Sequence, residues 1–170
     1  NKIDSGFIFN ISDDLAGQRV LEVGKVCELV YGDPLPENKR EEGEYPVYGA
    51  GNIIGTHNKF LTEGPAIIIG RRGATSGTVM FNEKSCWVID TAFFVKVKED
   101  NIDFKYLYYA LKGLNLFKYQ SGGAMPGVNR NDIYSEKIPV PPFETQRKIV
   151  KRLDRQMQAL EGVRLLKAEA

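Results

Sequence analysis

The architecture of this chain is decided by residues 138–143, IPVPPF, and by the pattern that follows them at residues 144–170, ETQRKIVKRLDRQMQALEGVRLLKAEA. Each proline fixes its own φ and keeps the residue before it out of the helical region, so the first stretch is predicted to be stiff and extended. The second stretch contains no proline and a single glycine, Gly162. A helix over its 27 residues would be about 40 Å long. We therefore expect a rigid joint followed by a rod that is longer than a domain of this size needs.

The apolar residues at the start of the expected rod are spaced by three, four and three positions: Val150, Leu153, Met157 and Leu160. This narrow stripe is typical of a coiled-coil seam rather than of the broad face of a buried helix. One interpretation is a terminal helix folded back on its own core, and the other is a spacer that pairs with a partner helix. The next positions of the repeat are polar, Arg164 and Lys167, so we expect the seam to weaken towards the end.

Length and composition indicate one domain with an appendage. The chain has 170 residues, of which 42% are hydrophobic and 26% charged, as in ordinary globular proteins. We expect an N-terminal extension at residues 1–19, a globular domain at 20–142 and the helix at 143–170. No apolar run approaches the length of a membrane span and no signal peptide heads the sequence, which favours a cytoplasmic location. The start at Asn1, without a methionine, indicates a fragment or a processed chain.

The cysteines and the histidine indicate neither a metal site nor a cofactor, and the net charge does not by itself indicate nucleic-acid binding. Cys27 and Cys86 stand outside any paired-cysteine motif, so two buried thiols are expected. The single histidine, His57, has no second histidine to help it hold a metal, and we expect it to be a solvent-facing or hydrogen-bonded strand residue. The net charge of +1 is no signature of nucleic-acid binding, although basic loops on such a globule can still contact DNA.

The middle of the chain is rich in β-branched and aromatic residues, and the later part is rich in helix formers. Strands are expected within residues 20–31 and at 45–48, 53–60, 65–69, 78–81, 87–89 and 92–97. Helices are expected at 104–113 and 114–119, with a further turn at 132–134 capped by Asn129 or Asn131. Residues 12–14, Ser-Asp-Asp, are candidates to cap a short helix through Gln18. Strands before helices predict an α+β fold: a small mixed or antiparallel β-sheet domain with helices, followed by a long C-terminal spacer helix.

Residues 138–150, IPVPPFETQRKIV, resemble the segment that ends each target-recognition domain in the specificity subunits of type I restriction–modification systems. The family pattern is an apolar-Pro-apolar-Pro-Pro run, then Glu-x-Gln and a long spacer helix. Further blocks are similar to the family in the same order: residues 21–29, 45–55, 64–73, 90–93, 106–111 and 121–132. The resemblance implies a module that reads one half of a bipartite target in double-stranded DNA and directs methyltransferase and restriction subunits to it. One such unit is present, which fits either half of a subunit or a single-domain version.

A glycine-flanked loop at residues 70–77 is the main candidate for DNA contact. Arg71 and Arg72 follow a buried strand, the neighbouring glycines let the backbone approach a groove, and arginine suits bidentate contact with guanine. The loop lacks the Gly-Lys-Ser/Thr ending and the following helix of a phosphate-binding P-loop. The alternative is that the two arginines are only exposed to solvent at a turn. The family resemblance favours the interpretation that they contact DNA. The candidate DNA-binding residues are Tyr48, Asn52, Lys59, Arg71, Arg72, Thr75, Lys118 and Arg130.

The start of the rod is the candidate site for partner proteins. We expect a methyltransferase subunit to dock there across the stiff joint, together with parts of the 121–132 loop. A second recognition unit, or a second copy of the chain, is expected to pair along the apolar stripe. The alternative is a rigid linker without a partner. The candidate partner-binding residues are Gln146, Arg147, Val150, Lys151, Leu153, Met157 and Leu160.

No catalytic constellation is apparent in the sequence. The methyltransferase motif Asn-Pro-Pro-Tyr/Phe is absent, since Val140 stands where the motif requires asparagine. A hydrolase that uses Asp90, His57 and a serine has no further support. The sequence therefore predicts a DNA-specificity component, with catalysis in partner subunits. Two alternatives are the recognition portion of a single-chain methyltransferase–nuclease, and a protein that dimerises through its C-terminal helix and does not bind DNA.

Overall fold

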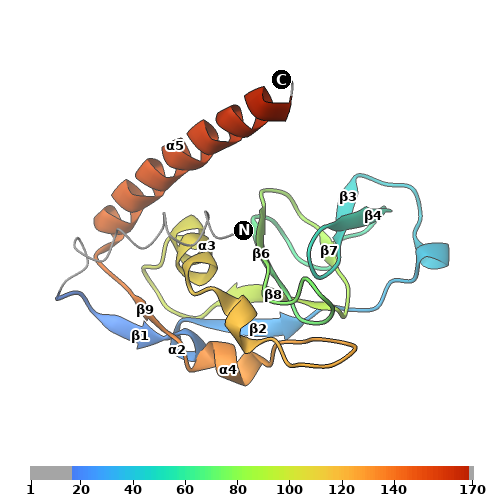
Figure 1. The fold of residues 1–170 in the computed structure, drawn as a ribbon, viewed down its shortest axis with the longest axis horizontal. Coiled ribbons are helices and arrows are strands. Elements are labelled where there is room, and N and C mark those ends of the chain that lie inside the picture. The colour runs from blue at the N-terminus through green and yellow to red at the C-terminus, as the bar shows by residue number, and fades with distance from the viewer. Residues whose placement is uncertain (1–16, 169–170) are drawn as a thin grey trace.

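A four-stranded antiparallel sheet forms the centre of the structure, a computed structural model that describes residues 17–168 (Figure 1). Its strands follow the spatial order β2 (Cys27–Tyr31), β8 (Ala92–Val97), β5 (Ala66–Gly70) and β6 (Val79–Asn82). All five residues of β5 are buried, which confirms the buried strand predicted from the apolar run at residues 65–69.

Two smaller sheets flank the central one. β3 (Tyr45–Tyr48) pairs antiparallel with β4 (Ile53–His57) and parallel with β7 (Trp87–Val88), so this sheet is mixed. β1 (Val20–Glu22) pairs antiparallel with β9 (Lys137–Pro139). Together with the surrounding helices and the long final helix, these sheets confirm the predicted α+β fold.

The two faces of the central sheet are covered by different elements. One face packs against α3 (Phe104–Gly113) and α4 (Arg130–Tyr134), and Ile69 of β5 belongs to the core cluster on that side. The next residue towards the N-terminus, Ile68, belongs to a second cluster with Tyr48 of β3 and with β7. Successive side chains of a strand point to opposite faces, which is why the continuous apolar run of β5 serves both clusters.

The structure differs from the local expectations at several short segments. Residues 20–31, within which strands are expected, contain β1, the single helical turn α2 (Val23–Val26) and β2. The expected short helix at 114–119 is the 3-10 turn η3 (Leu116–Tyr119), and the charged loop before β3 contains another, η2 (Glu37–Lys39). The proline run begins as strand β9, where Pro139 is tolerated because a two-stranded sheet has only edge strands. Residues 12–14 lie outside the described residues, and Gly17 and Gln18, at the end of the short helix expected there, are not helical.

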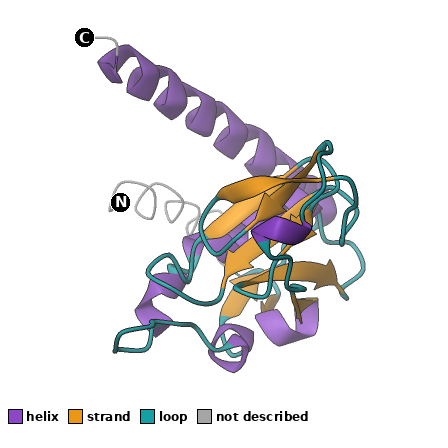
Figure 2. Cartoon of the chain, turned by 90° about the vertical axis from the view of Figure 1, so that its right-hand side faces the viewer, coloured by secondary structure: helices purple, strands orange, loops and turns teal. Residues whose placement is uncertain are grey.

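Helix α5 (Phe143–Ala168) confirms the predicted rod and projects away from the sheets, as Figures 1 and 2 show. Its first half packs on α3, where Ile149 and Leu153 share a cluster with Tyr106 and Tyr109. The Tyr109 hydroxyl also donates to Asp154 of α5 at 2.5 Å. Neither α5 nor any other helix within residues 17–168 has the length and apolar character needed to cross a membrane.

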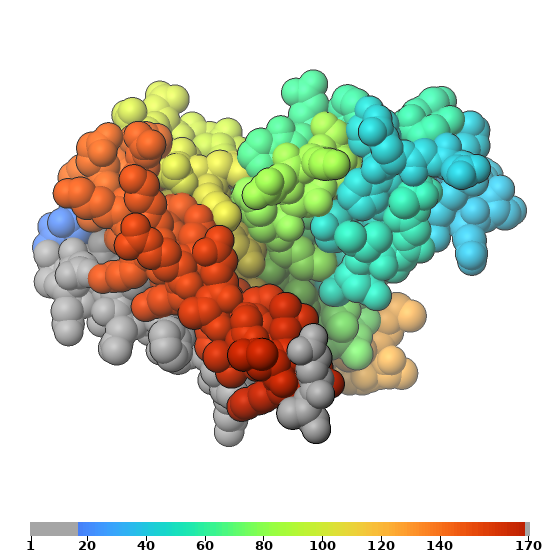
Figure 3. All heavy atoms as spheres, turned by 90° about the horizontal axis from the view of Figure 1, so that it is seen from above, coloured from blue at the N-terminus to red at the C-terminus, as the bar shows by residue number. Residues whose placement is uncertain are grey.

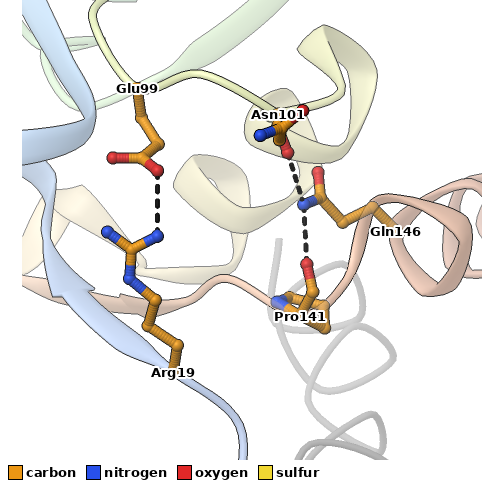
Figure 4. Close-up of polar contacts among 5 residues, drawn as sticks. All are labelled: Arg19, Glu99, Asn101, Pro141 and Gln146. Atoms are coloured by element: carbon orange, nitrogen blue, oxygen red, sulfur yellow. Dashed lines mark hydrogen bonds and ion pairs between the residues drawn. The ribbon is translucent and has the colours of Figure 1, made fainter.

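The joint between the sheets and α5 is held by the fully buried side chain of Gln146 (Figure 4). Its amide nitrogen donates to the backbone oxygens of Asn101, at 3.0 Å, and Pro141, at 2.8 Å. Its amide oxygen accepts from the backbone N–H of Asp103 at 2.8 Å. One side chain thus ties the first turn of α5 to the proline run and to the segment that begins α3.

Candidate nucleic-acid interface

Two glycine-rich loops that are far apart in the sequence are joined side by side. The backbone N–H of Gly73 donates to the oxygen of Pro126 at 2.8 Å, and that of Val128 donates to the oxygen of Arg71 at 2.9 Å. The side-chain amide of Gln120 donates to two backbone oxygens of the first loop, those of Ala74 and Ser76. We call residues 70–78 and 120–131 the paired loops. Each carries candidate DNA-binding residues, Arg71, Arg72 and Thr75 in the first and Arg130 in the second, and the structure joins the two in one surface.

A third turn lies against the paired loops, where Gly51 closely approaches the side chain of Thr75. This turn, residues 49–52, is closed by the Gly49 N–H, which donates to the Asn52 oxygen at 2.9 Å. A Cβ added to Gly51 would lie 2.5 Å from the Cβ of Thr75, so only glycine permits this approach. Asn52 and Thr75 are both exposed, and each is available to a ligand on this surface.

An aromatic ring that the sequence analysis did not select lies at the centre of the surface. Tyr31 ends β2 and is 47% exposed. The ζ carbons of Arg71 and Arg130 lie over its ring, at 4.8 and 4.7 Å from the ring centroid. The ring of Phe93, its cross-strand partner, packs 5.2 Å away. We call Arg71, Tyr31 and Arg130 the arginine–tyrosine stack.

The stack borders a cavity of about 410 Å³ that carries excess positive charge. Arg71, Arg72 and Arg130 line the cavity with one carboxylate, that of Asp132. Within residues 17–168, neither Arg71 nor Arg130 forms an ion pair. The Nε of Arg71 is shielded from solvent and has no hydrogen-bond partner there, while Arg130 makes one long bond, 3.4 Å, to the oxygen of Leu29. Three permanent cations facing one anion favour an anionic ligand.

Lys118 is already engaged within the chain. Its Nζ lies 2.5 Å from the Glu136 carboxylate, which also accepts a hydrogen bond from the Tyr119 hydroxyl. Partial burial opposes ionisation of Glu136, but the hydrogen bonds from Lys118 and Tyr119 and the Lys118 charge hold its pKa below the usual range. The bond to Glu136 raises the pKa of Tyr119 to about 12. Much of the charge that Lys118 would offer to DNA is therefore offset by its neighbour.

Two further candidates for DNA contact lie outside the paired loops. Tyr48 is only 6% exposed, and its hydroxyl donates to Asn82 at 3.3 Å. Lys59 is exposed, but it follows β4 and stands next to Phe60, whose ring contacts Tyr45 in the three-stranded sheet. A contact from either residue would need DNA to extend beyond the paired loops or, for Tyr48, a local rearrangement.

The candidate partner-binding residues on α5 fall into three groups. Gln146 and Leu153 are buried within the chain, and Val150 and Met157 pack at the border of the same cluster on α3. Arg147 and Lys151 are exposed, and Leu160 is half-buried. The first half of the predicted seam is therefore occupied by the chain's own α3, as the folded-back interpretation expected.

The start of α5 and the 121–129 loop lie far apart in the molecule. Figure 1 places that loop beyond α4 at the lower right and the first turns of α5 at the left, and the view from above in Figure 3 separates them as widely. A single small contact patch cannot include both. A partner that docks on the joint would have to be large, or wrapped, to reach the paired loops as well.

The remaining titratable candidates serve the fold. His57 is 5% exposed, and its Nδ1 accepts from the Glu41 backbone N–H at 3.0 Å, which confirms the expected hydrogen-bonded strand residue. Cys27 and Cys86 are buried free thiols, as expected, and burial raises their pKa values to about 12 and about 11. In the part of the chain that the structure describes, no three His, Cys, Asp or Glu side chains are grouped so as to hold a metal ion.

The fold has counterparts among solved structures. The S subunit of a type I restriction–modification system from M. genitalium superposes with a TM-score of 0.72 at 23% identity, over 99% of this chain and 51% of that one. A chain from a study of complex assembly and conformational transition of the type I R-M system gives a TM-score of 0.73 at 20% identity, over 99% and 47%. At these identities the likeness establishes the fold alone.

The sequence comparisons establish the family. The type I restriction enzyme EcoprrI specificity subunit of Escherichia coli is 28% identical over 148 residues, which make up 84% of this chain and 36% of that protein. The chain thus spans about a third of this curated relative. Residues 18–169 match the family model of the type I restriction modification DNA specificity domain. Since this match covers nearly the whole chain, the chain belongs to the type I restriction modification DNA specificity domain family, which is a family of specificity domains and not of enzymes.

Proposed function

We propose that this chain reads one half of a bipartite target in double-stranded DNA through the paired loops, with residues 20–142 as the recognition domain and 143–170 as the spacer. The observation that carries the proposal is the union of two distant loops around a cavity lined by three arginines. Such a surface provides both kinds of contact that specific DNA binding requires, cationic contacts to phosphates and bidentate donors for base edges. Arg72 is exposed beside the cavity and is the arginine best placed to reach a base.

The proposal assigns methylation and cleavage to partner subunits. Arg147 and Lys151 remain exposed at the start of α5, so this basic end of the rod stays our candidate for a methyltransferase subunit. Beyond the α3 contact, Ala159, Val163 and Leu166 are spaced by four and three residues and share one exposed face of α5. That face is rotated by roughly a third of a turn from Leu153. We propose it as the surface that pairs with a second spacer helix, in place of the earlier stripe.

Replacing Arg71 and Arg72 together with alanine will weaken binding of the reconstituted complex to its target. A base-reading arginine is worth about 1–3 kcal/mol and its loss relaxes specificity at one position, whereas loss of a phosphate contact weakens binding to all sequences alike. Titration of fluorescent target and non-target duplexes at several salt concentrations measures both effects.

The matched control for this double variant is Lys39→Ala, which removes an exposed cation of η2, outside the paired loops. The proposal expects the control to bind nearly as the parent does. Equal affinities of parent and double variant for the target at every salt concentration would remove the paired loops from the interface.

A further inference from the structure

We propose that the arginine–tyrosine stack is a preformed seat for one backbone phosphate of the DNA, and that Tyr31 is the positioning residue of this seat. The inference rests on the proposed function and deepens it, because it divides the arginines of the interface into two roles. Arg71 and Arg130 hold the backbone, and Arg72 is left to read a base. Tyr31 needs no contact with DNA to matter.

The hydrogen-bonding capacity of the stack points to a phosphate. A guanidinium carries five N–H donors. Its contact with the face of an aromatic ring is electrostatic and leaves these N–H groups available for hydrogen bonds. In the described residues the Nε of Arg71 is shielded and unpaired, which leaves the outer guanidinium nitrogens of Arg71 for a ligand, and Arg130 has only the long bond to Leu29. Neither cation forms an ion pair with a carboxylate of residues 17–168. Phosphate oxygens match guanidinium donors in geometry and supply the missing charge.

The backbone around Arg71 explains why this residue holds rather than reads. Its N–H donates to the Thr91 oxygen at 2.8 Å, and its own oxygen accepts from Val128 at 2.9 Å. With the backbone fixed on both sides and the side chain laid over Tyr31, Arg71 cannot extend into a groove. Arg72 shares the Thr91 acceptor, but its side chain is exposed. Of these two adjacent arginines, therefore, only Arg72 can extend its side chain towards a base.

Tyr31 has a specific task in this arrangement. Two guanidiniums at 4.8 and 4.7 Å from one ring centroid repel each other, and the negative face of the ring offsets part of that repulsion. Removing the ring should let the two cations separate and leave the phosphate without a prepared site. The phenol oxygen is not required for this task, so phenylalanine should replace tyrosine without loss.

The experiment compares Tyr31→Leu, Tyr31→Phe and Arg130→Ala in the reconstituted complex, on target and unrelated duplexes. We expect Tyr31→Leu and Arg130→Ala to weaken binding to both duplexes by about tenfold and to lower the slope of log K against log salt by about one. Tyr31→Phe should bind as the parent does. A purely structural role for Tyr31 would change affinity without this change in slope.

A second arm identifies the phosphate itself. Target duplexes in which one phosphate at a time is replaced by a neutral methylphosphonate should reveal one position that weakens the parent but not Arg130→Ala. Inorganic phosphate, added at constant ionic strength, shows whether the seat also takes a free anion; the proposal expects little competition.

The outcomes distinguish a failure of the phosphate seat from a failure of the proposed DNA-recognition function. The phosphate seat is overturned if the parent complex binds DNA but the salt slopes of the variants are unchanged and no methylphosphonate position loses its effect in Arg130→Ala. The proposed function stays intact in that case. Equal weakening by Tyr31→Phe and Tyr31→Leu also overturns the seat, because the ring would not be the cause. A parent complex without salt-sensitive DNA binding overturns both.

Discussion

Leu153→Asp will remove about 4 kcal/mol from the free energy of unfolding, because Leu153 is 3% exposed and packs within the chain on the tyrosines of α3. Loss of a buried leucine side chain alone costs about 2–5 kcal/mol, and the carboxylate adds a burial penalty that no described partner relieves. The chain can escape this penalty only by releasing α5 from α3. Chemical denaturation gives the loss in stability, and hydrogen exchange along α5 shows whether the helix has detached.

The contrasting variant is Leu166→Asp on the same helix, where the leucine is 69% exposed. The isolated chain should keep its stability, while any pairing of spacer helices should weaken, as sedimentation would show. Leu165→Asp, on another exposed face of α5, controls for the added charge. A stable Leu153→Asp chain would mean that α5 does not dock on α3 as described.

Gln146→Leu will cost about 3 kcal/mol, since it leaves three backbone groups at the joint without their partner. A buried donor or acceptor left unsatisfied costs about 1–3 kcal/mol, and the oxygen of the exposed Asn101 can turn to water while the buried Pro141 cannot. Leucine keeps the volume, so the effect measures hydrogen bonding more than packing. Urea unfolding of the variant beside Gln158→Leu, an exposed glutamine of the same helix, checks this.

Gln146→Glu sharpens this prediction through its pH dependence. An ionised carboxylate can accept from Asp103 but cannot donate to the oxygens of Asn101 and Pro141, so folding favours the protonated acid and raises its pKa above the unfolded value. Stability of this variant should therefore be greatest at low pH and fall as pH rises through the folded pKa. Equal destabilisation at pH 4 and pH 7 would show that the carboxyl group reaches solvent.

Local sequence patterns were sufficient for the elements of this fold but not for its joint. The apolar run at 65–69 and the proline run followed by helix formers predicted β5 and α5 because strand and helix periodicities are local. The pairing of β1 with β9, and the three bonds of Gln146, join segments that no local pattern relates. The sequence predicts a partner contact for Gln146, because a position at the edge of an apolar stripe does not reveal which element covers the side chain.

The candidate interface was predictable only in part for the same reason. Glycines mark Arg71 as a loop residue and place Arg130 directly after a loop, at the start of α4, and both arginines were candidates for DNA contact. Tyr31 was missed because its role depends on Arg130, which lies 99 positions away in the chain yet 4.7 Å from the ring. The ion pair of Lys118 with Glu136 could not be foreseen either, since charge alone does not tell a free lysine from an engaged one.

The central claim, that the paired loops face the target DNA, is tested most directly by cross-linking. The natural thiols of Cys27 and Cys86 are buried, so single exposed cysteines introduced by Ala74→Cys or Ala124→Cys will dominate disulfide exchange with duplexes that carry a thiol tether on one phosphate. In a reconstituted complex that methylates its target, both loop variants should cross-link to tethers within one half of the target. Gln158→Cys on α5 serves as the control. Cross-links from the control, with none from either loop, would contradict the account.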